Sequence, residues 1–216
     1  MSNIIITINR ESGSGGREIA CRMGKMLGLK VYDKAILESL SEKYNLNHDE
    51  IERLKAKRTN FWDDFCQFYR QFSAVGETYQ PEDKKVTSRE LYYAEAEIMR
   101  NLAQQESCII VGRSAFHVFK DNPDAMRVFI IAGRDIRIKN VALRDGIDEK
   151  AAAKQIDETD KAREIFTKNF AGVSRYDARN YDITINVGSF STEAVAAFLA
   201  ENIRRKMDLE ITAGVK

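Results

Sequence analysis

The stretch that decides the fold is NIIITINRESGSGGREIA, residues 3–20. Residues 3–8 are apolar and β-branched, which predicts a strand buried on both faces. The glycine-rich segment 9–17 predicts a turn, and apolar residues then recur at helical spacing as far as Gly28, a residue type that commonly ends a helix. The stretch therefore predicts a strand, a tight glycine turn and an amphipathic helix.

The alternation of strands and helices continues along most of the chain. Four further β-branched segments predict strands at 30–33, 108–111, 127–132 and 182–187. Helical patterns lie between them, including a basic helix from Arg134 and a charged helix over about 148–170. Strands that alternate with helices form a parallel sheet with helices on both faces. We therefore expect a three-layer α/β fold with a five-stranded parallel sheet.

Residues 45–85 differ from the rest because they carry no strand pattern. Charged helical patterns come first, and an aromatic cluster follows at 61–72. We expect a helical insertion at 45–85 within a core domain formed by residues 1–44 and 86–216. The aromatic cluster would be the small core of this insertion. The alternative is a partner surface, which would allow a homodimer.

The composition narrows the classes of function. The 216 residues include 34 Lys and Arg against 33 Asp and Glu, a formal net charge of +1. This balance argues against a nucleic-acid binder and leaves room for a local anion site. No apolar run reaches the roughly 20 residues of a transmembrane helix, and residues 1–8 lack the basic start of a signal peptide. We expect no membrane partner.

The cysteines and histidines predict neither a metal site nor a disulfide framework. The three cysteines show no metal-ligand spacing, and there are only two histidines, which argues against a zinc site. We therefore expect no metal ligands among these side chains. A reduced, cytoplasmic compartment is the expectation that follows from the cysteine usage.

In a parallel sheet, ligands bind beyond the carboxyl ends of the strands, where the turn at 12–17 falls. Its glycines let backbone N–H groups approach phosphate oxygens at a helix N-terminus. The turn departs from the usual phosphate-loop pattern GxxxxGK[ST]. In one register Gly16 replaces the lysine, and in the other Arg17 and Glu18 replace the lysine and the hydroxyl residue. A glycine turn without a ligand is the alternative.

Two further features fall at the same edge of the predicted sheet. Arg113 follows the third strand and could fork onto a phosphate, or it could be a solvated loop arginine. The charged segment 157–168 places Lys161 and Lys168 on one helical face. It is either a solvated helix or a lid that closes cations over phosphates.

These motifs, in this order, resemble the cytidylate kinase-like family, relatives of bacterial cytidylate kinase among the P-loop nucleoside monophosphate kinases. The segments that carry the resemblance are residues 8–18, 32–34, 111–113, 122–125, 159–163 and 181–186. They cover almost the whole chain. The resemblance implies the P-loop NTPase fold, with the insertion as the acceptor-binding region and a lid at about 148–175.

The resemblance also implies ATP and Mg²⁺ as cofactors and a set of binding residues. The residues expected to hold the ATP phosphates are Ser12, Gly13, Ser14, Gly15, Gly16, Arg17 and Glu18. The acceptor would bind near Asp33 and Lys34, with Arg113 on its phosphate.

The catalytic residues implied by the resemblance are all cations. Phosphoryl transfer depends mainly on positioning and on charges around the transferred group. Arg17, in place of the missing lysine, would act together with Lys161 and Arg163 of the lid. The implied activity is transfer of the ATP γ-phosphate to a nucleoside monophosphate or another small anionic acceptor.

The sequence departs from the cytidylate kinase pattern where that family holds its pyrimidine nucleotide. Lys34, Ser39 and Ser114 stand at these places, so we expect CMP to be a poor acceptor. The missing phosphate-loop lysine favours an alternative function, a nucleotide-binding regulatory module without turnover.

Overall fold

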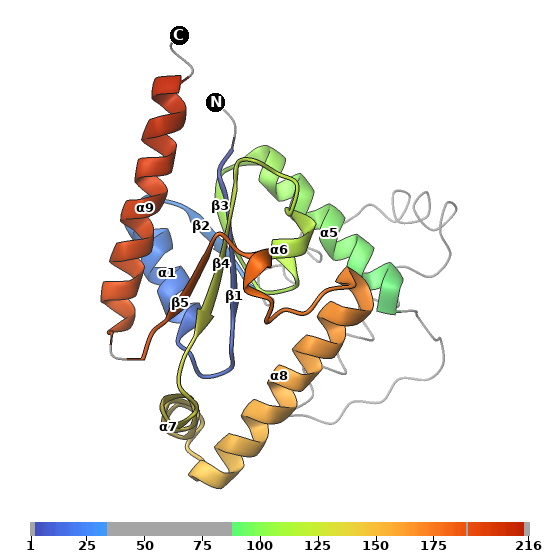
Figure 1. Cartoon of the computed structure of the whole chain (residues 1–216), viewed down its shortest axis with the longest axis vertical. Coiled ribbons are helices and arrows are strands. Elements are labelled where there is room, and N and C mark those ends of the chain that lie inside the picture. The colour runs from blue at the N-terminus through green and yellow to red at the C-terminus, as the bar shows by residue number, and fades with distance from the viewer. Residues whose placement is uncertain (1–2, 34–87, 189, 214–216) are drawn as a thin grey trace. The chain divides into compact units, whose positions relative to one another are not determined.

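The computed structural model describes residues 3–33, 88–188 and 190–213. Its elements (Figure 1) are β1 Ile5–Arg10, α1 Gly16–Leu27, β2 Lys30–Tyr32, α5 Ser88–Gln105, β3 Cys108–Val111, α6 Ala115–Val118, β4 Ala125–Ile131, α7 Arg134–Asp145, α8 Glu149–Ala171, a 3₁₀ turn Ala178–Asn180, β5 Ile183–Asn186 and α9 Thr192–Ala213. Two compact units divide the chain: residues 1–33 with 102–216, and residues 34–101. The predicted insertion and its aromatic cluster lie outside the described residues, so both stay predictions.

The five strands form one parallel sheet in the order β2-β3-β1-β4-β5. β1 lies at its centre, paired with β3 on one side and with β4 on the other. Every residue of β3 is buried, as is every residue of β1 up to Asn9, which explains the apolar, β-branched composition of both strands. The five-stranded parallel sheet predicted from the sequence is confirmed.

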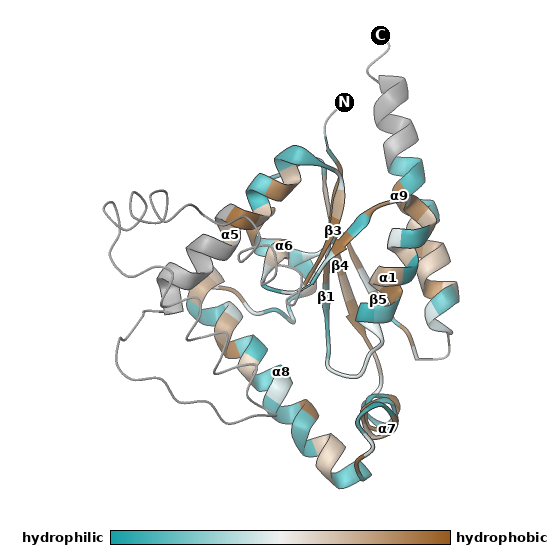
Figure 2. Cartoon of the chain, turned by 180° about the vertical axis from the view of Figure 1, so that it is seen from behind, coloured by the Kyte–Doolittle hydropathy of each residue, from teal (hydrophilic) through white to brown (hydrophobic). Residues whose placement is uncertain are grey.

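One face of the sheet is covered by α1 and α9, which lie side by side (Figure 1). Alternate residues of β1 point toward these helices, and Met23 of α1 and Leu199 of α9 are fully buried between the layers. Figure 2 shows the apolar residues concentrated on the strands and on the helix faces turned toward them. α1 ends just before Gly28, as its sequence pattern predicts.

The opposite face of the sheet carries α6 and an aromatic core. Phe116 of α6 and Phe129 of β4 each pack on Tyr181, with ring centroids 4.9 Å from that of Tyr181. The Tyr181 hydroxyl donates to the carbonyl of Arg175 and accepts from the amide of Asn9. These two hydrogen bonds fasten the segment after α8 to the central strand.

α7 and α8 form a helical hairpin, and side chains of both helices contact the loop after β1. Val141 of α7 packs on Ala152 and Ile156 of α8. The buried stripe of α8 continues at helical spacing through Asp160 to Thr167, so its first half is apolar and its second half is polar. None of the described helices combines the length and apolar composition that crossing a bilayer requires.

β1 begins and ends two residues later than the sequence pattern indicates. The ladder with β4 runs on to Arg10, which pairs with Ile130. The pattern ended the strand at Ile8 because Asn9 and Arg10 are polar. In the fold, the side chain of Asn9 donates to the Tyr181 hydroxyl. This hydrogen bond offsets the cost of burying a polar group, so the strand continues. Arg10 is consequently the last residue of the central strand.

Candidate active site

The glycine-rich turn joins the end of β1 to the start of α1. Gly13 and Gly15 have φ of 83° and 79°, in the left-handed region that glycine enters without steric cost. In the described part of the chain, no acceptor takes the N–H groups of Gly13, Gly15, Gly16 and Arg17. Unused N–H groups at a helix N-terminus form an anion-binding site.

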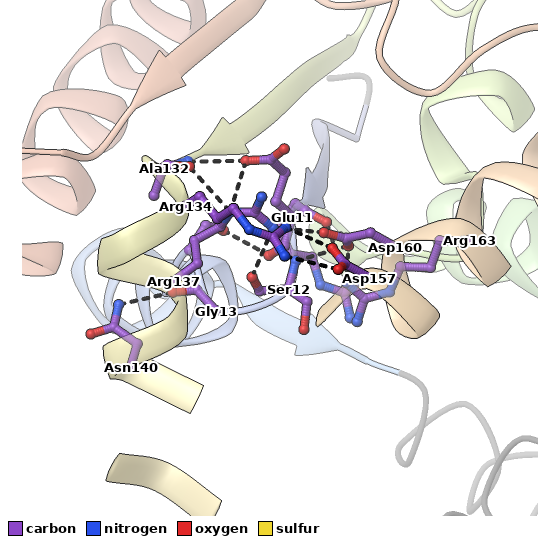
Figure 3. A network of polar contacts seen from close by, with 12 residues as sticks. Glu11, Ser12, Gly13, Ala132, Arg134, Arg137, Asn140, Asp157, Asp160 and Arg163 are labelled. Atoms are coloured by element: carbon purple, nitrogen blue, oxygen red, sulfur yellow. Dashed lines mark hydrogen bonds and ion pairs between the residues drawn. The ribbon is translucent and has the colours of Figure 1, made fainter. Parts of the chain in front are cut away.

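α7 holds this turn from outside (Figure 3). Arg137 Nη1 donates to the carbonyl of Ser12 at 3.3 Å, and Asn140 Nδ2 donates to the carbonyl of Gly13 at 2.8 Å. A Cβ atom on Gly13 would lie 2.6 Å from the Arg137 carbonyl oxygen. The backbone of the turn is therefore packed against α7, which fixes its shape.

Asp160 of α8 joins the turn to both helices. Its Oδ1 accepts the N–H of Ser12 at 2.9 Å, and its Oδ2 pairs with Arg137 Nη1 at 2.8 Å. Both side chains of this ion pair are only 10% exposed. Arg137 Nε also lies 3.5 Å from Glu11 Oε2. Because a buried charge without its partner is costly, Asp160 and Arg137 depend on each other.

Four arginines gather beside the turn, at the carboxyl ends of β1 and β3. This arginine cluster consists of Arg10, Arg113, Arg163 and Arg175. Nη1 of Arg163 lies 3.4 Å from the Arg10 carbonyl, and Arg175 Nη2 donates to the same carbonyl. Asp160 Oδ1 lies 3.4 Å from Arg163 and 3.5 Å from Arg175. A single carboxylate is thus shared by both arginines and by Arg137.

The electrostatics of the cluster favour an anion. Burial, followed by the charges of Arg163, Arg175 and Arg113, lowers the pKa of Arg10 well below its usual value. Burial and Arg175 lower the pKa of Arg163 to about 10, against the opposing effect of Asp160. Arg175 is fully buried, and its Nε and Nη1 have no hydrogen-bond acceptor among the described residues. A bound anion would supply the missing acceptors and negative charge.

Two residues predicted to bind ATP phosphates or to act in catalysis are engaged elsewhere. Arg17 pairs with Asp33 at 2.8 Å, and its side chain is 73% exposed while that of Asp33 is 12% exposed. The Glu18 carboxylate accepts from Arg22 Nε at 3.0 Å and from Thr192 Oγ1 at 2.8 Å. These contacts attach Glu18 to the side of α1 and to α9.

The turn after β3 has an unusual backbone. Gly112, Arg113 and Ser114 follow one another in the left-handed region, with φ of 84°, 57° and 53°. Such a conformation costs about 1–3 kcal/mol at each non-glycine residue. α8 contacts this turn, because the Arg113 guanidinium lies 5.1 Å from the Phe166 ring and Ser114 Oγ lies 3.1 Å from Thr167 Oγ1.

The two predicted lid cations lie on different faces of α8. Arg163 is half-buried and reaches the arginine cluster, whereas Lys161 is exposed to solvent. Asp160, Arg163 and Thr167 follow one another by three or four residues and so face the same way. Lys34 and Ser39, which were expected at the acceptor site, lie outside the described residues.

Sequence reasoning assigned no individual role to Arg10, Arg137, Asn140, Asp160 or Arg175, although the last two fall within the expected lid at about 148–175. For two of them a signal is present. Asp160 lies four residues after Ile156, on the apolar stripe of α8, and Arg137 lies four residues before Val141 of α7. A charged residue in phase with a buried stripe indicates a buried partner. The other three carry no comparable pattern.

The fold and the site together define a class of protein. A parallel sheet with a glycine-rich turn after its central strand, leading into a helix, is the α/β arrangement found in P-loop proteins. The chain belongs to the cytidylate kinase-like family, whose family model matches residues 5–189.

Two cytidylate kinases are among the curated relatives. A cytidylate kinase of Methanopyrus kandleri is 24% identical over 96% of this chain and 97% of its own length. A cytidylate kinase of Pyrococcus horikoshii is 23% identical over 91% of this chain and 86% of its own length. A crystal structure of an uncharacterized protein from Eubacterium ventriosum shares the fold, with a TM-score of 0.68, 24% identity and coverage of 94% and 99% of the two chains.

Proposed function

We propose that this chain is an ATP-dependent phosphotransferase that transfers the γ-phosphate to a nucleoside monophosphate or another small anionic acceptor. The observation that carries the proposal is the junction of four unused backbone N–H groups with the arginine cluster at one edge of the sheet. Both features favour an anion, and in this proposal the phosphates of ATP would reach from the turn to the arginine cluster. Family membership supports the same class of ligand.

Each part of the site has a role in this proposal. The turn Ser12–Arg17 would hold the phosphates of ATP, the donor of the transferred group. Arg163 would stabilise charge on that group from α8, with Lys161 and Arg17 as further cations. Arg113, together with Asp33 and Lys34, would bind the acceptor. Electrostatic stabilisation of this kind is the main requirement of phosphoryl transfer.

The fit of the cofactors differs between the nucleotide and the metal ion. The phosphates of ATP match the unused N–H groups and the buried guanidinium of Arg175. Mg²⁺ usually keeps several waters and binds through phosphates and one or two carboxylates. Within the described ranges, no group of three or more His, Cys, Asp and Glu side chains could hold a metal ion. The hydroxyl of Ser14, a residue of the turn, is used in a hydrogen bond to the Glu11 carbonyl at 2.9 Å. In the proposal, Mg²⁺ therefore binds together with ATP, through the phosphates.

A nucleotide-binding regulatory module is the second candidate function. Gly16 stands at the lysine position of the phosphate loop, and Asp160 fastens the turn to α8 through Ser12. In this alternative, a bound nucleotide would change the contact between Asp160 and Ser12, and so between α8 and the turn, without turnover.

ADP release separates the two candidates. The protein is incubated with Mg-ATP and, in separate reactions, CMP, dCMP, UMP, AMP and small phosphorylated or carboxylated alcohols. Acceptor-dependent ADP release supports the phosphotransferase. A rise in melting temperature with Mg-ATP or ADP, without turnover of any acceptor, supports the regulatory module. Millimolar Mg-ATP, ADP and GTP that all leave the melting temperature unchanged would contradict both candidates.

A further inference from the structure

The structure settles how the turn aligns with the phosphate-loop pattern. β1 ends at Arg10, Gly15 caps the N-terminus of α1, and Gly16 is the first helical residue. Counted between these ends, GxxxxGK places its first glycine at Arg10 and its lysine at Gly16. The chain thus has an arginine where the pattern has glycine, and a glycine where the pattern has lysine.

The two substitutions meet in space. A Cβ atom on Gly16 would lie 2.6 Å from Cβ and 3.0 Å from Cγ of Arg10. The stem of Arg10 thus fills the space in which a side chain at position 16 would begin. Because a Cβ atom cannot swing away as the end of a side chain can, Arg10 and any larger residue at 16 exclude each other.

A second glycine borders the other end of the same side chain. A Cβ atom on Gly112 would collide with Nη1 of Arg10 and lie 3.1 Å from its Cζ. Arg10 therefore extends from Gly16 at the start of α1 to Gly112 at the end of β3, along the carboxyl edge of the sheet. Its guanidinium ends among the arginine cluster, and no carboxylate of the described residues forms an ion pair with it.

We propose that Arg10 supplies, from the last residue of β1, the cation that lysine supplies in the usual phosphate loop. This inference rests on the proposed function and names the cation of its donor site. It gives Arg10 the role that the sequence alone gave to Arg17. Arg17 has Asp33 as an ion-pair partner and a largely exposed side chain, whereas the stem of Arg10 lies against Gly16 of the turn.

The geometry gives Arg10 two properties that suit this role. Its stem is held between a strand and a helix start, so little side-chain entropy remains to be lost on binding. Its planar guanidinium can bind two phosphate oxygens at once. Burial and three neighbouring arginines disfavour its charge and outweigh the opposing effect of Asp33 on its pKa, and an incoming anion would relieve this repulsion.

The test is an exchange of the two residues, measured by calorimetric binding of Mg-ATP and of inorganic tripolyphosphate. Arg10→Met keeps the apolar stem and removes the charge. It should weaken the binding of both ligands about 10- to 100-fold, the range for hydrogen bonds to a charged group, while the melting temperature is kept or raised. Arg205→Met removes an exposed arginine of α9 that pairs with Glu201, and it should bind both ligands like the wild type.

The exchange itself gives the sharper result. Gly16→Lys in the wild-type background should lower the melting temperature, because the new side chain collides with Arg10. The double variant Arg10→Gly/Gly16→Lys should regain that stability, because the collision is removed. It should bind Mg-ATP within about tenfold of the wild type, because it restores the glycine and the lysine of the usual phosphate loop. A merely structural role for Arg10 would not predict recovery of binding.

The possible failures are distinguishable. If the wild type binds neither ligand, the proposed function and this inference both fall. If the wild type binds and Arg10→Met binds within twofold of it, only the inference is overturned. Should Arg10→Met fail to fold, the double variant decides: recovered binding supports the exchange, and absent binding overturns it.

Discussion

Asp160→Asn removes one negative charge from the buried network and keeps the size of the side chain. In the wild type, Asp160 accepts the Ser12 N–H and pairs with Arg137 at 2.8 Å, with both ion-pair side chains 10% exposed. The asparagine oxygen can still accept from Ser12. What is lost is the negative charge that lies 2.8 Å from Arg137 Nη1. The buried guanidinium keeps Glu11, whose Oε2 lies farther away, 3.5 Å from Nε.

The expected loss of stability follows from this burial. Removing one partner of a buried ion pair costs about 3–5 kcal/mol. Because the hydrogen bond to Ser12 is retained, we expect a value near the lower end, about 3 kcal/mol. For a chain of this length, 1 kcal/mol corresponds to about 2–4 °C in melting temperature. Asp160→Asn should therefore lower the melting temperature by about 6–12 °C.

Thermal unfolding followed by circular dichroism measures this shift, and Asp157→Asn provides a matched control. Asp157 lies on the same helix and pairs with Arg134 at 2.6 Å, but the two side chains are 59% and 49% exposed. Exposed ion pairs contribute little, so the control should melt nearly where the wild type does. A shift below about 2 °C for Asp160→Asn, or equal shifts for both variants, would refute the reasoning.

Three further predictions concern activity and reactivity. Arg163→Ala should lower kcat about 10²–10³-fold with little loss of stability, because this cation is proposed to act on the transferred group. Arg17→Ala should lower kcat less, because Arg17 is exposed and pairs with Asp33; near-normal turnover of Arg163→Ala would exclude its role. CMP should be a poor acceptor, which a kcat/KM for CMP above about 10⁴ M⁻¹s⁻¹ would disprove. Burial raises the pKa of Cys108 to about 12, so at pH 8 it stays a thiol and should resist alkylation, whereas the exposed Cys21 should react. Mass spectrometry of the labelled peptides measures both reactions, and equal modification would contradict the buried position of Cys108.

The central strand shows where sequence reasoning was sufficient. Apolar, β-branched residues at 4–8 can be buried on both faces only in the middle of a sheet, so their strand was predictable. The same pattern could not locate the end of the strand. Asn9 is polar, and its burial depends on Tyr181, a residue 172 positions away.

The candidate site divides in the same way. The glycine-rich turn at 12–17 and the end of β3 before Gly112 were predictable, because glycine and arginine at strand ends are local signals. The local pattern also indicated Arg17 as the replacement for lysine, since it is the nearest cation in the chain. In the structure that side chain pairs with Asp33, a contact between the start of α1 and the end of β2 that the local pattern does not indicate.

The sequence by itself determined the α/β class, the parallel sheet and the position of the turn. These depend on the period of apolar residues and on glycine, which act over a few residues. Only the tertiary structure decided which charges meet. Arg10, Arg163 and Arg175 come from a strand, a helix and a loop, and they converge because α8 and the segment after it lie against the end of β1. The space that Gly16 leaves for Arg10 likewise exists only once α1 packs against β1, because close packing is a property of the assembled layers.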